Sequence, residues 1–86
     1  MADKEKVRVS VMIYGKQYTI SGTEPAEHVM KVAGTVDKKM REIYSVNPNL
    51  NTESLAVLTA VNSIHDYMKL QEEYHLLLKE FNRLKD

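Results

Sequence analysis

The side chains that could perform chemistry in this chain are three histidines and the acidic residues near them. Glu72 and His75 have the Glu-x-x-His spacing, which places both on one helical face and occurs in di-iron helical bundles. Such a site also needs inward-facing glutamates. A heptad assignment places Glu72 at position f and His75 at position b, away from a helix–helix interface. Surface residues explain this pair better than metal ligands.

The other candidates for catalysis are weaker. His65 and Asp66 are adjacent, and neighbouring residues on a helix do not face each other. His28 stands alone, with no nucleophile or second acid beside it. The three glycines are scattered and form no phosphate-binding loop. We therefore expect a protein that is not an enzyme and that binds neither a metal nor a cofactor.

Charge and composition exclude further classes. Twelve basic and twelve acidic side chains give a net charge of zero, which argues against nucleic-acid binding. The chain has no cysteine, so disulfides and thiolate metal sites are absent. No window approaches the length of apolar chain that spans a membrane, and the charged start, residues 1–6, precedes no signal region. We expect a cytoplasmic protein whose residues 1–6 are a frayed lead-in.

A long helix must position most of the candidates above. Residues 52–86 contain no Gly or Pro, and as one helix they would span about 52 Å at about 1.5 Å per residue. Their second half has aromatic residues at heptad position a and leucines at position d: Tyr67, Tyr74, Phe81, Leu70, Leu77 and Leu84. Nothing else in one chain can cover this line. Because Leu76 and Leu78 widen it, a bundle of more than two helices is favoured.

The first half of this helix has another apolar stripe, at Val57, Val61, Ile64 and Met68, with Leu55 and Leu58 beside it. We expect this stripe to pack on the rest of the chain and on a dimer partner. Asn62 lies among these residues, and hydrogen bonding to its symmetry mate could fix the dimer register. The complete expected oligomerisation surface is Val57, Val61, Asn62, Ile64, Tyr67, Met68, Leu70, Tyr74, Leu77, Leu78, Phe81 and Leu84.

The N-terminal half predicts a β-hairpin. Residues 7–13 alternate between apolar and polar side chains, and Gly15-Lys16 would form a two-residue turn. The resulting cross-strand pairs would be Tyr14 with Gln17, Ile13 with Tyr18, and Val11 with Ile20. The last two of these pairs would share one apolar face, which needs a cover because an isolated hairpin is marginally stable in water.

An amphipathic helix should provide this cover. Thr23 or Glu24 could cap it, and Pro25 suits its first turn. Its apolar residues have helical spacing: Val29, Val32, Ala33, Val36, Met40 and Ile43. Gly34 inside it could allow close approach of another helix, or could simply be tolerated. The helix should end before Pro48.

These elements define the expected architecture. Asn51 or Thr52 should cap the long helix, with Glu53 near its positive end. We predict an α+β fold in which residues 1–50 form a small head of hairpin and amphipathic helix. Residues 51–86 form the long helix, whose first half packs on the head and dimer partner and whose second half makes an intermolecular coiled coil or helical bundle.

Residues 55–62, Leu-Ala-Val-Leu-Thr-Ala-Val-Asn at the start of the long helix, resemble the signature of the ZapA family. These are small cytoplasmic bacterial proteins associated with the cell division ring. Residues 7–20 look like the opening hairpin of that family, and residues 29–43 look like its first helix. The three blocks follow the order of the family, and the resemblance extends over about residues 7–69.

The resemblance implies a homodimer whose dimers can pair into tetramers. It also implies binding at mid-cell to FtsZ, the tubulin-like GTPase, and cross-linking of its protofilaments during septation. Repeated weak contacts would give avidity along such a polymer. The candidate FtsZ-binding residues are exposed charges of the head: Lys38, Lys39, Arg41, Glu42 and Glu53. A generic homo-oligomeric adaptor with another protein client would share all these physical features.

Overall fold

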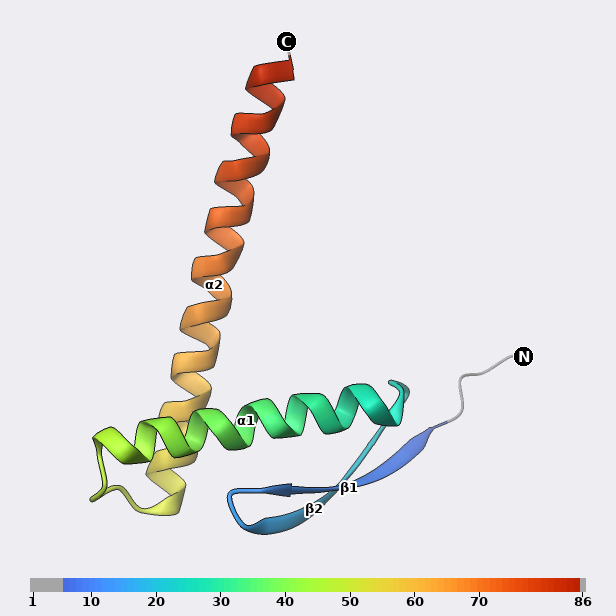
Figure 1. Cartoon of the computed structure of the whole chain (residues 1–86), viewed down its shortest axis with the longest axis vertical. Helices are drawn as coiled ribbons and strands as arrows, with labels where there is room; N and C mark the ends of the chain where they lie inside the picture. The colour runs from blue at the N-terminus through green and yellow to red at the C-terminus, as the bar shows by residue number, and fades with distance from the viewer. Residues whose placement is uncertain (1–5, 86) are drawn as a thin grey trace.

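The computed structural model describes residues 6–85. It contains strands β1 (Val7–Ile13) and β2 (Lys16–Gly22) and helices α1 (Ala26–Val46) and α2 (Thr52–Lys85). In Figure 1 the hairpin and α1 lie side by side, and α2 rises away from them. The α+β fold class with a long C-terminal helix is confirmed. The expectation for the lead-in falls outside the described residues, except at Lys6, which is exposed.

The hairpin register differs from the expected one. The observed pairs include Val9 with Ile20, Val11 with Tyr18, and Ile13 with Lys16. The turn is Tyr14-Gly15, with φ angles of 50° and 78°, and not Gly15-Lys16. Two positive φ angles characterise a type I′ turn, whose twist matches that of the strands. The expected pairing was therefore wrong by two residues, and because side chains alternate with period two, the same residues still share a face.

Contacts from α1 fix this turn. The backbone N–H of Tyr14 donates to Asp37 Oδ1 at 2.6 Å, and Arg41 Nε donates to Asp37 Oδ2 at 3.0 Å. The guanidinium carbon of Arg41 lies 5.5 Å from the centre of the Tyr14 ring. The ring of Tyr44 lies 6.1 Å from that of Tyr14, between centroids. Long-range contacts therefore stabilise a tyrosine in a conformation that usually favours Gly, Asn or Asp.

The core is small and lies mainly between β1 and α1. Its buried members are Val9, Val11 and Ala33, with Val7, Ile13 and Val29 partly buried around them. On β2, Tyr18 is 44% exposed and Ile20 is 36% exposed. The expected cover by α1 is therefore confirmed for β1 but incomplete for β2. One side of the apolar face of the hairpin remains open.

The ends of the helices follow local signals with one exception. Pro25 is itself the N-cap of α1 and makes no side-chain capping bond, so the expected cap by Thr23 or Glu24 was wrong. Asn47 ends α1, which confirms the stop before the second proline. Asn51 caps α2, because its side-chain oxygen accepts an amide hydrogen bond from the first turn at 2.8 Å.

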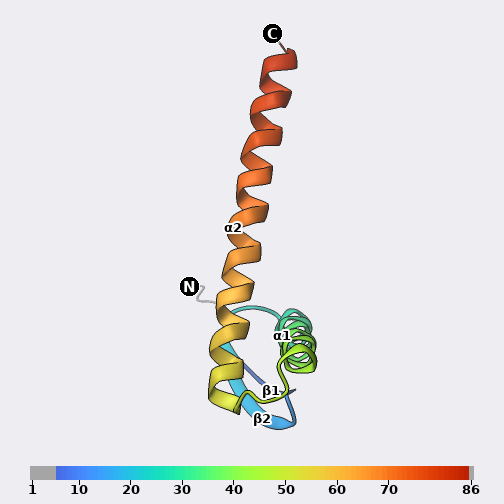
Figure 2. The same cartoon turned by 90° about the vertical axis from the view of Figure 1, so that its left-hand side faces the viewer.

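The long helix contacts the head over a short length only. Leu55 and Thr59 are the buried residues of α2, and every residue from 60 to 85 is exposed. An ion pair of 2.5 Å between Lys39 and Asp66 also joins α1 to α2. Figure 2 shows α1 end-on beside the first turns of α2, which continues well beyond it. The molecule measures 53 × 47 × 15 Å, so the helix projects as expected.

Of the apolar residues of α2 expected to pack on the head, Leu55 does so, whereas the four residues of the stripe itself do not. Val57, Val61, Ile64 and Met68 are each 56–58% exposed. The residue that packs most completely is Leu55, only 1% exposed. The helix is rotated so that this leucine and Thr59 face α1. Packing of the stripe on a dimer partner stays a prediction.

Substitution of two glycines by alanine should have opposite effects on stability. Gly15→Ala places a Cβ at φ 78°, which should cost about 1–2 kcal/mol. Gly34→Ala should gain about 0.5–1 kcal/mol, because Gly34 is inside a helix and a Cβ there meets nothing within 4 Å. Thermal unfolding at one fixed protein concentration measures both. A lower midpoint for Gly34→Ala would contradict the prediction and indicate another helix against that position.

Candidate assembly surfaces of the head and the long helix

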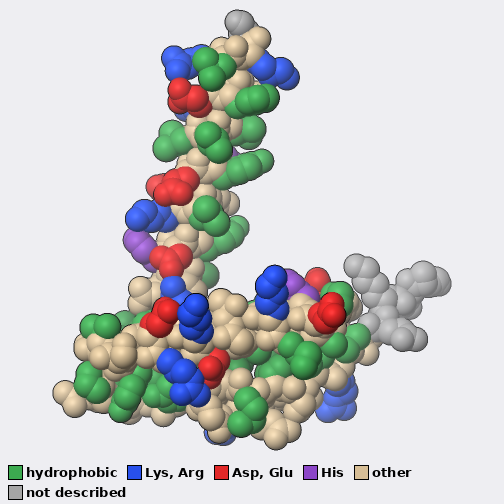
Figure 3. Space-filling view, viewed as in Figure 1, with side chains coloured by type: hydrophobic (Ala, Val, Ile, Leu, Met, Phe, Trp, Pro, Cys, Tyr) green, Lys and Arg blue, Asp and Glu red, His purple; other side chains and the backbone are tan. Residues whose placement is uncertain are grey.

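The projecting part of α2 exposes the whole heptad line, which we call the distal seam: Tyr67, Leu70, Tyr74, Leu77, Phe81 and Leu84. These six side chains are 58–75% exposed. In Figure 3 most of the apolar side chains of the projecting helix lie toward one side, and most of its charged side chains lie toward the other. A continuous exposed apolar surface of this kind is typical of a protein–protein interface.

The apolar stripe nearer the head faces another direction, and we call Val57, Val61, Ile64 and Met68 the proximal stripe. At about 100° per residue, its average direction is roughly opposite to that of Leu55 and Thr59, which contact the head. Around the axis of α2, the average direction of the distal seam lies roughly 140° from that of the proximal stripe. The residues that the sequence grouped as one surface therefore form two, and α2 offers apolar contact in two directions along its length.

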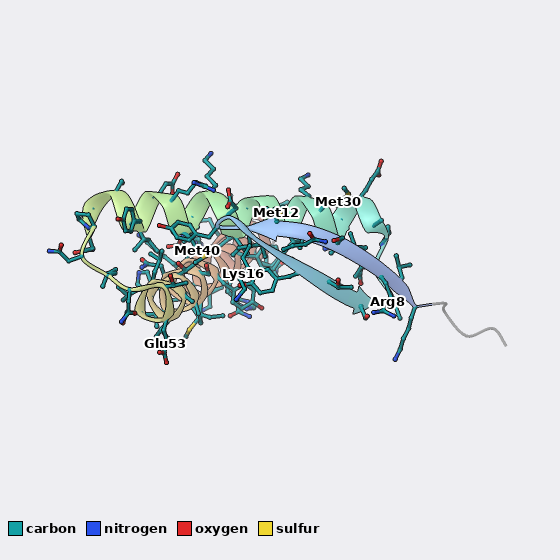
Figure 4. All side chains as sticks on the ribbon, turned by 90° about the horizontal axis from the view of Figure 1, so that it is seen from below. Arg8, Met12, Lys16, Met30, Met40 and Glu53 are labelled. Carbon is teal, nitrogen blue, oxygen red and sulfur yellow. The ribbon has the colours of Figure 1, made fainter. Side chains whose placement is uncertain are left out.

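A third apolar surface is a groove in the head that the sequence did not reveal. It has a volume of about 730 Å³ and lies between β2, α1 and the start of α2. Its apolar lining includes Ile13, Tyr18, Ile20, Val36, Met40 and Ala56. Figure 4 looks at this region from below and shows Met40 between α1 and the start of α2. The groove exists because α1 covers β1 and leaves β2 open.

Smaller depressions extend this groove in two directions. One, of about 260 Å³, continues along α1 past Val29 and Val32 and includes His28. Another, of about 320 Å³, follows α2 past Ala60 and reaches Ile64. The groove of the head is therefore continuous with the lower part of α2. The only sequence signal for it was the pair of apolar residues on β2, which one helix could not cover together with β1.

The five candidate charges are in different environments. Lys39 is paired with Asp66, and Arg41 is paired with Asp37. The remaining three, Lys38, Glu42 and Glu53, are exposed. None of the three forms an ion pair within residues 6–85. Figure 4 shows Glu53 at the outer side of the first turn of α2. Two of the candidates are therefore in ion pairs, Lys39 between α1 and α2 and Arg41 within α1, and three are available at the surface.

These ion pairs change the acidity of their carboxylates. The hydrogen bond from Arg41, followed by that from the Tyr14 backbone, holds the pKa of Asp37 below its ordinary value. The hydrogen bond from Lys39 and its positive charge lower the pKa of Asp66 in the same way. Both carboxylates are therefore stabilised in their charged form in the folded protein.

The residues first considered for chemistry do not come together. The ring of His75 packs edge-on against Tyr74, with centroids 5.8 Å apart. Within residues 6–85 there is no group of three or more His, Cys, Asp or Glu side chains that could hold a metal ion. Over the same residues, no helix combines the length and the apolar character needed to cross a membrane.

Comparison with known proteins identifies the family. Residues 9–86 match the family model described as cell division protein ZapA. The chain belongs to the ZapA family. It is 56% identical to the cell division protein ZapA of Geobacillus sp. strain WCH70, over 100% of this chain and 99% of that protein. It is 54% identical to the ZapA of Bacillus velezensis, over 93% of this chain and 94% of that protein.

A solved ZapA structure agrees with this result. A ZapA mutant dimer from Geobacillus stearothermophilus matches with a TM-score of 0.72 and 46% identity, and each chain is 95% covered. The likeness confirms the fold of the present chain. The resemblance inferred from three sequence blocks was therefore correct.

Asn62 has a hydrogen bond within its own helix in this ZapA-family chain. Its Nδ2 donates to the backbone oxygen of Leu58 at 3.1 Å, and the side chain is exposed. Within the described chain, the buried residues of α2 are Leu55 and Thr59, and Asn62 is not among them. A hydrogen bond between two copies of Asn62 stays a prediction.

Replacing Leu77 by glutamate should weaken assembly through the distal seam. A charge there would have to be buried among aromatic and leucine side chains, so Leu77→Glu should shift the protein to smaller oligomers. Light-scattering mass over a concentration series measures this shift. Asn82→Glu makes the same change in charge at heptad position b and serves as the control. An unchanged mass for Leu77→Glu would contradict an interface at this seam.

Acid should weaken the attachment of the hairpin turn to α1. A lowered pKa of Asp37 contributes stability that is present above the ordinary aspartate value of about 3.9 and is lost as pH falls through the lowered value. The Asp37→Asn variant lacks this carboxylate, so its stability should decrease less than that of the wild type when the pH is lowered from about 6 to about 3. The midpoint of urea unfolding at each pH measures this decrease. Glu72→Gln is the control, since Glu72 has no ion pair within residues 6–85. An equal loss in Asp37→Asn and wild type would contradict the assignment.

Proposed function

We propose that this protein binds FtsZ and cross-links or bundles its protofilaments, promoting assembly and stability of the division ring without enzymatic activity. The observation that carries the proposal is membership of the ZapA cell division family over residues 9–86. The resemblance of the sequence to that family implies FtsZ as the partner. The exposed apolar surfaces of α2 support an architectural role, because association through them would place several heads in one oligomer.

The assembly is a homodimer, and dimers associate further into a homotetramer. In this proposal the proximal stripe and the groove of the head are covered by a second copy of the chain. The distal seam then joins dimers through a coiled coil or a bundle of helices. Two directions of apolar contact on one helix support two kinds of partner helix. Each assembly presents several identical heads, so modest affinity per head becomes avidity on a polymer.

The head carries the contact with FtsZ, in the cytoplasm at mid-cell. Of the five charged candidates, three are exposed and unpaired within residues 6–85: Lys38, Glu42 and Glu53. The other two, Lys39 and Arg41, remain candidates through the parts of their side chains that are not in ion pairs. FtsZ and further copies of this chain are the partners. Neither a nucleic acid, a membrane nor a cofactor takes part.

Light-scattering mass and FtsZ co-sedimentation under GTP, measured at the same concentrations, test this function. We expect bundled FtsZ to increase with the largest oligomer, and Leu77→Glu to reduce both while Asn82→Glu reduces neither. Bundling by a protein that stays dimeric would show that two heads suffice and that the distal seam is not the cross-linking device. Oligomerisation without any binding to FtsZ would overturn the proposed function and favour an adaptor with another client.

A further inference from the structure

At the turn of the hairpin, the ring of Tyr14 contacts both Arg41 and Tyr44 of α1. Tyr14 has φ 50°, a conformation that costs about 1 kcal/mol or more for a residue with a Cβ. A turn of this type is easily made with Asn or Gly, so a tyrosine is not needed to form it. Its ring is instead held in place between α1 residues, with Arg41 at 5.5 Å and Tyr44 at 6.1 Å.

The guanidinium of Arg41 is oriented by one hydrogen bond, and its remaining donors are available to a partner. Its Nε donates to Asp37 at 3.0 Å, and within residues 6–85 its two terminal nitrogens have no hydrogen-bond acceptor. The side chain is 60% exposed. Asp37 is itself fixed by the Tyr14 backbone, so it acts as a positioning residue. An arginine held in this way offers a planar pair of donors that fits a carboxylate.

The charge of the hairpin beside the turn favours an acidic partner. Lys16 is next to the turn, and the described hairpin region, residues 6–22, contains no acidic residue. Lys6 and Arg8 lie toward the opposite end of the hairpin. Tyr44 is 39% exposed and adds an aromatic surface beside the ring of Tyr14. Arginine and tyrosine are the residue types that most often dominate binding energy at protein interfaces.

We propose that Arg41, together with the ring of Tyr14 beside it and the ring of Tyr44 beside Tyr14, is a docking site for an acidic segment of a partner protein. A carboxylate of the partner binds the terminal nitrogens of Arg41, and an adjacent apolar group packs on Tyr44. The site deepens the proposed function and rests on it, since FtsZ polymer is the partner used to test it. It selects one residue from the five charged candidates and adds the two tyrosines, which the sequence did not indicate.

Arg41→Lys is the sharpest test, because lysine keeps the charge and can still pair with Asp37 but loses the planar pair of donors. We expect this variant to bind FtsZ polymer about fivefold or more weakly in co-sedimentation under GTP, with unchanged thermal midpoint and oligomer mass. Arg83→Lys makes the same substitution in the exposed ion pair with Glu80 on the distal part of α2, and should bind like wild type. Tyr44→Ala should weaken binding to a similar degree.

The outcomes separate the two proposals. Wild-type protein that fails to co-sediment with FtsZ would overturn the proposed function and this site with it. Wild-type binding that Arg41→Lys and Tyr44→Ala both retain would overturn the docking site alone. A smaller oligomer mass for Arg41→Lys would place the cluster between copies of the chain, which would also overturn it.

Discussion

Helix α1 packs against β1 and leaves the apolar side chains of β2 and of most of α2 uncovered. The other features of the molecule depend on this uncovered apolar surface. Val9, Val11 and Ala33 form a core that is too small to include Tyr18 and Ile20. Domains of this size bury a limited fraction of their surface and often need association to become stable. The groove in the head and the exposed sides of α2 are therefore both results of a chain that cannot complete its core alone.

The polar contacts of the head have a different role from its apolar surfaces. Asp37 and Arg41 attach the hairpin turn to α1, and Lys39 with Asp66 attaches α1 to α2. Exposed ion pairs contribute little free energy, so these pairs orient elements more than they stabilise them. The apolar surfaces favour association between copies of the chain. The oriented charged side chains instead give the surface of the head a fixed arrangement of charges. The proposed cross-linking of FtsZ protofilaments would use both properties.

Much of the fold could be predicted because its signals are local. The alternating strand, the stop before Pro48 and the absence of Gly and Pro from the long helix are direct effects of neighbouring residues on backbone conformation. The family could be recognised from three short blocks for the same reason. The hairpin register could not, because Tyr14-Gly15 and Gly15-Lys16 are both possible turns, and the contacts with Asp37 come from a residue far along the chain.

The sequence by itself determined the elements, their order, the family and the apolar line of the distal seam, because each follows from residue types at fixed spacing along one element. The tertiary structure decided which side of α2 meets the head, since the rotation of a helix is set by what packs on it. Leu55 contacts the head, and Val57 and Val61 do not. It also decided the groove beside β2 and the arginine–tyrosine cluster at the turn. Both combine residues from separate elements, whose contacts no spacing along the chain specifies.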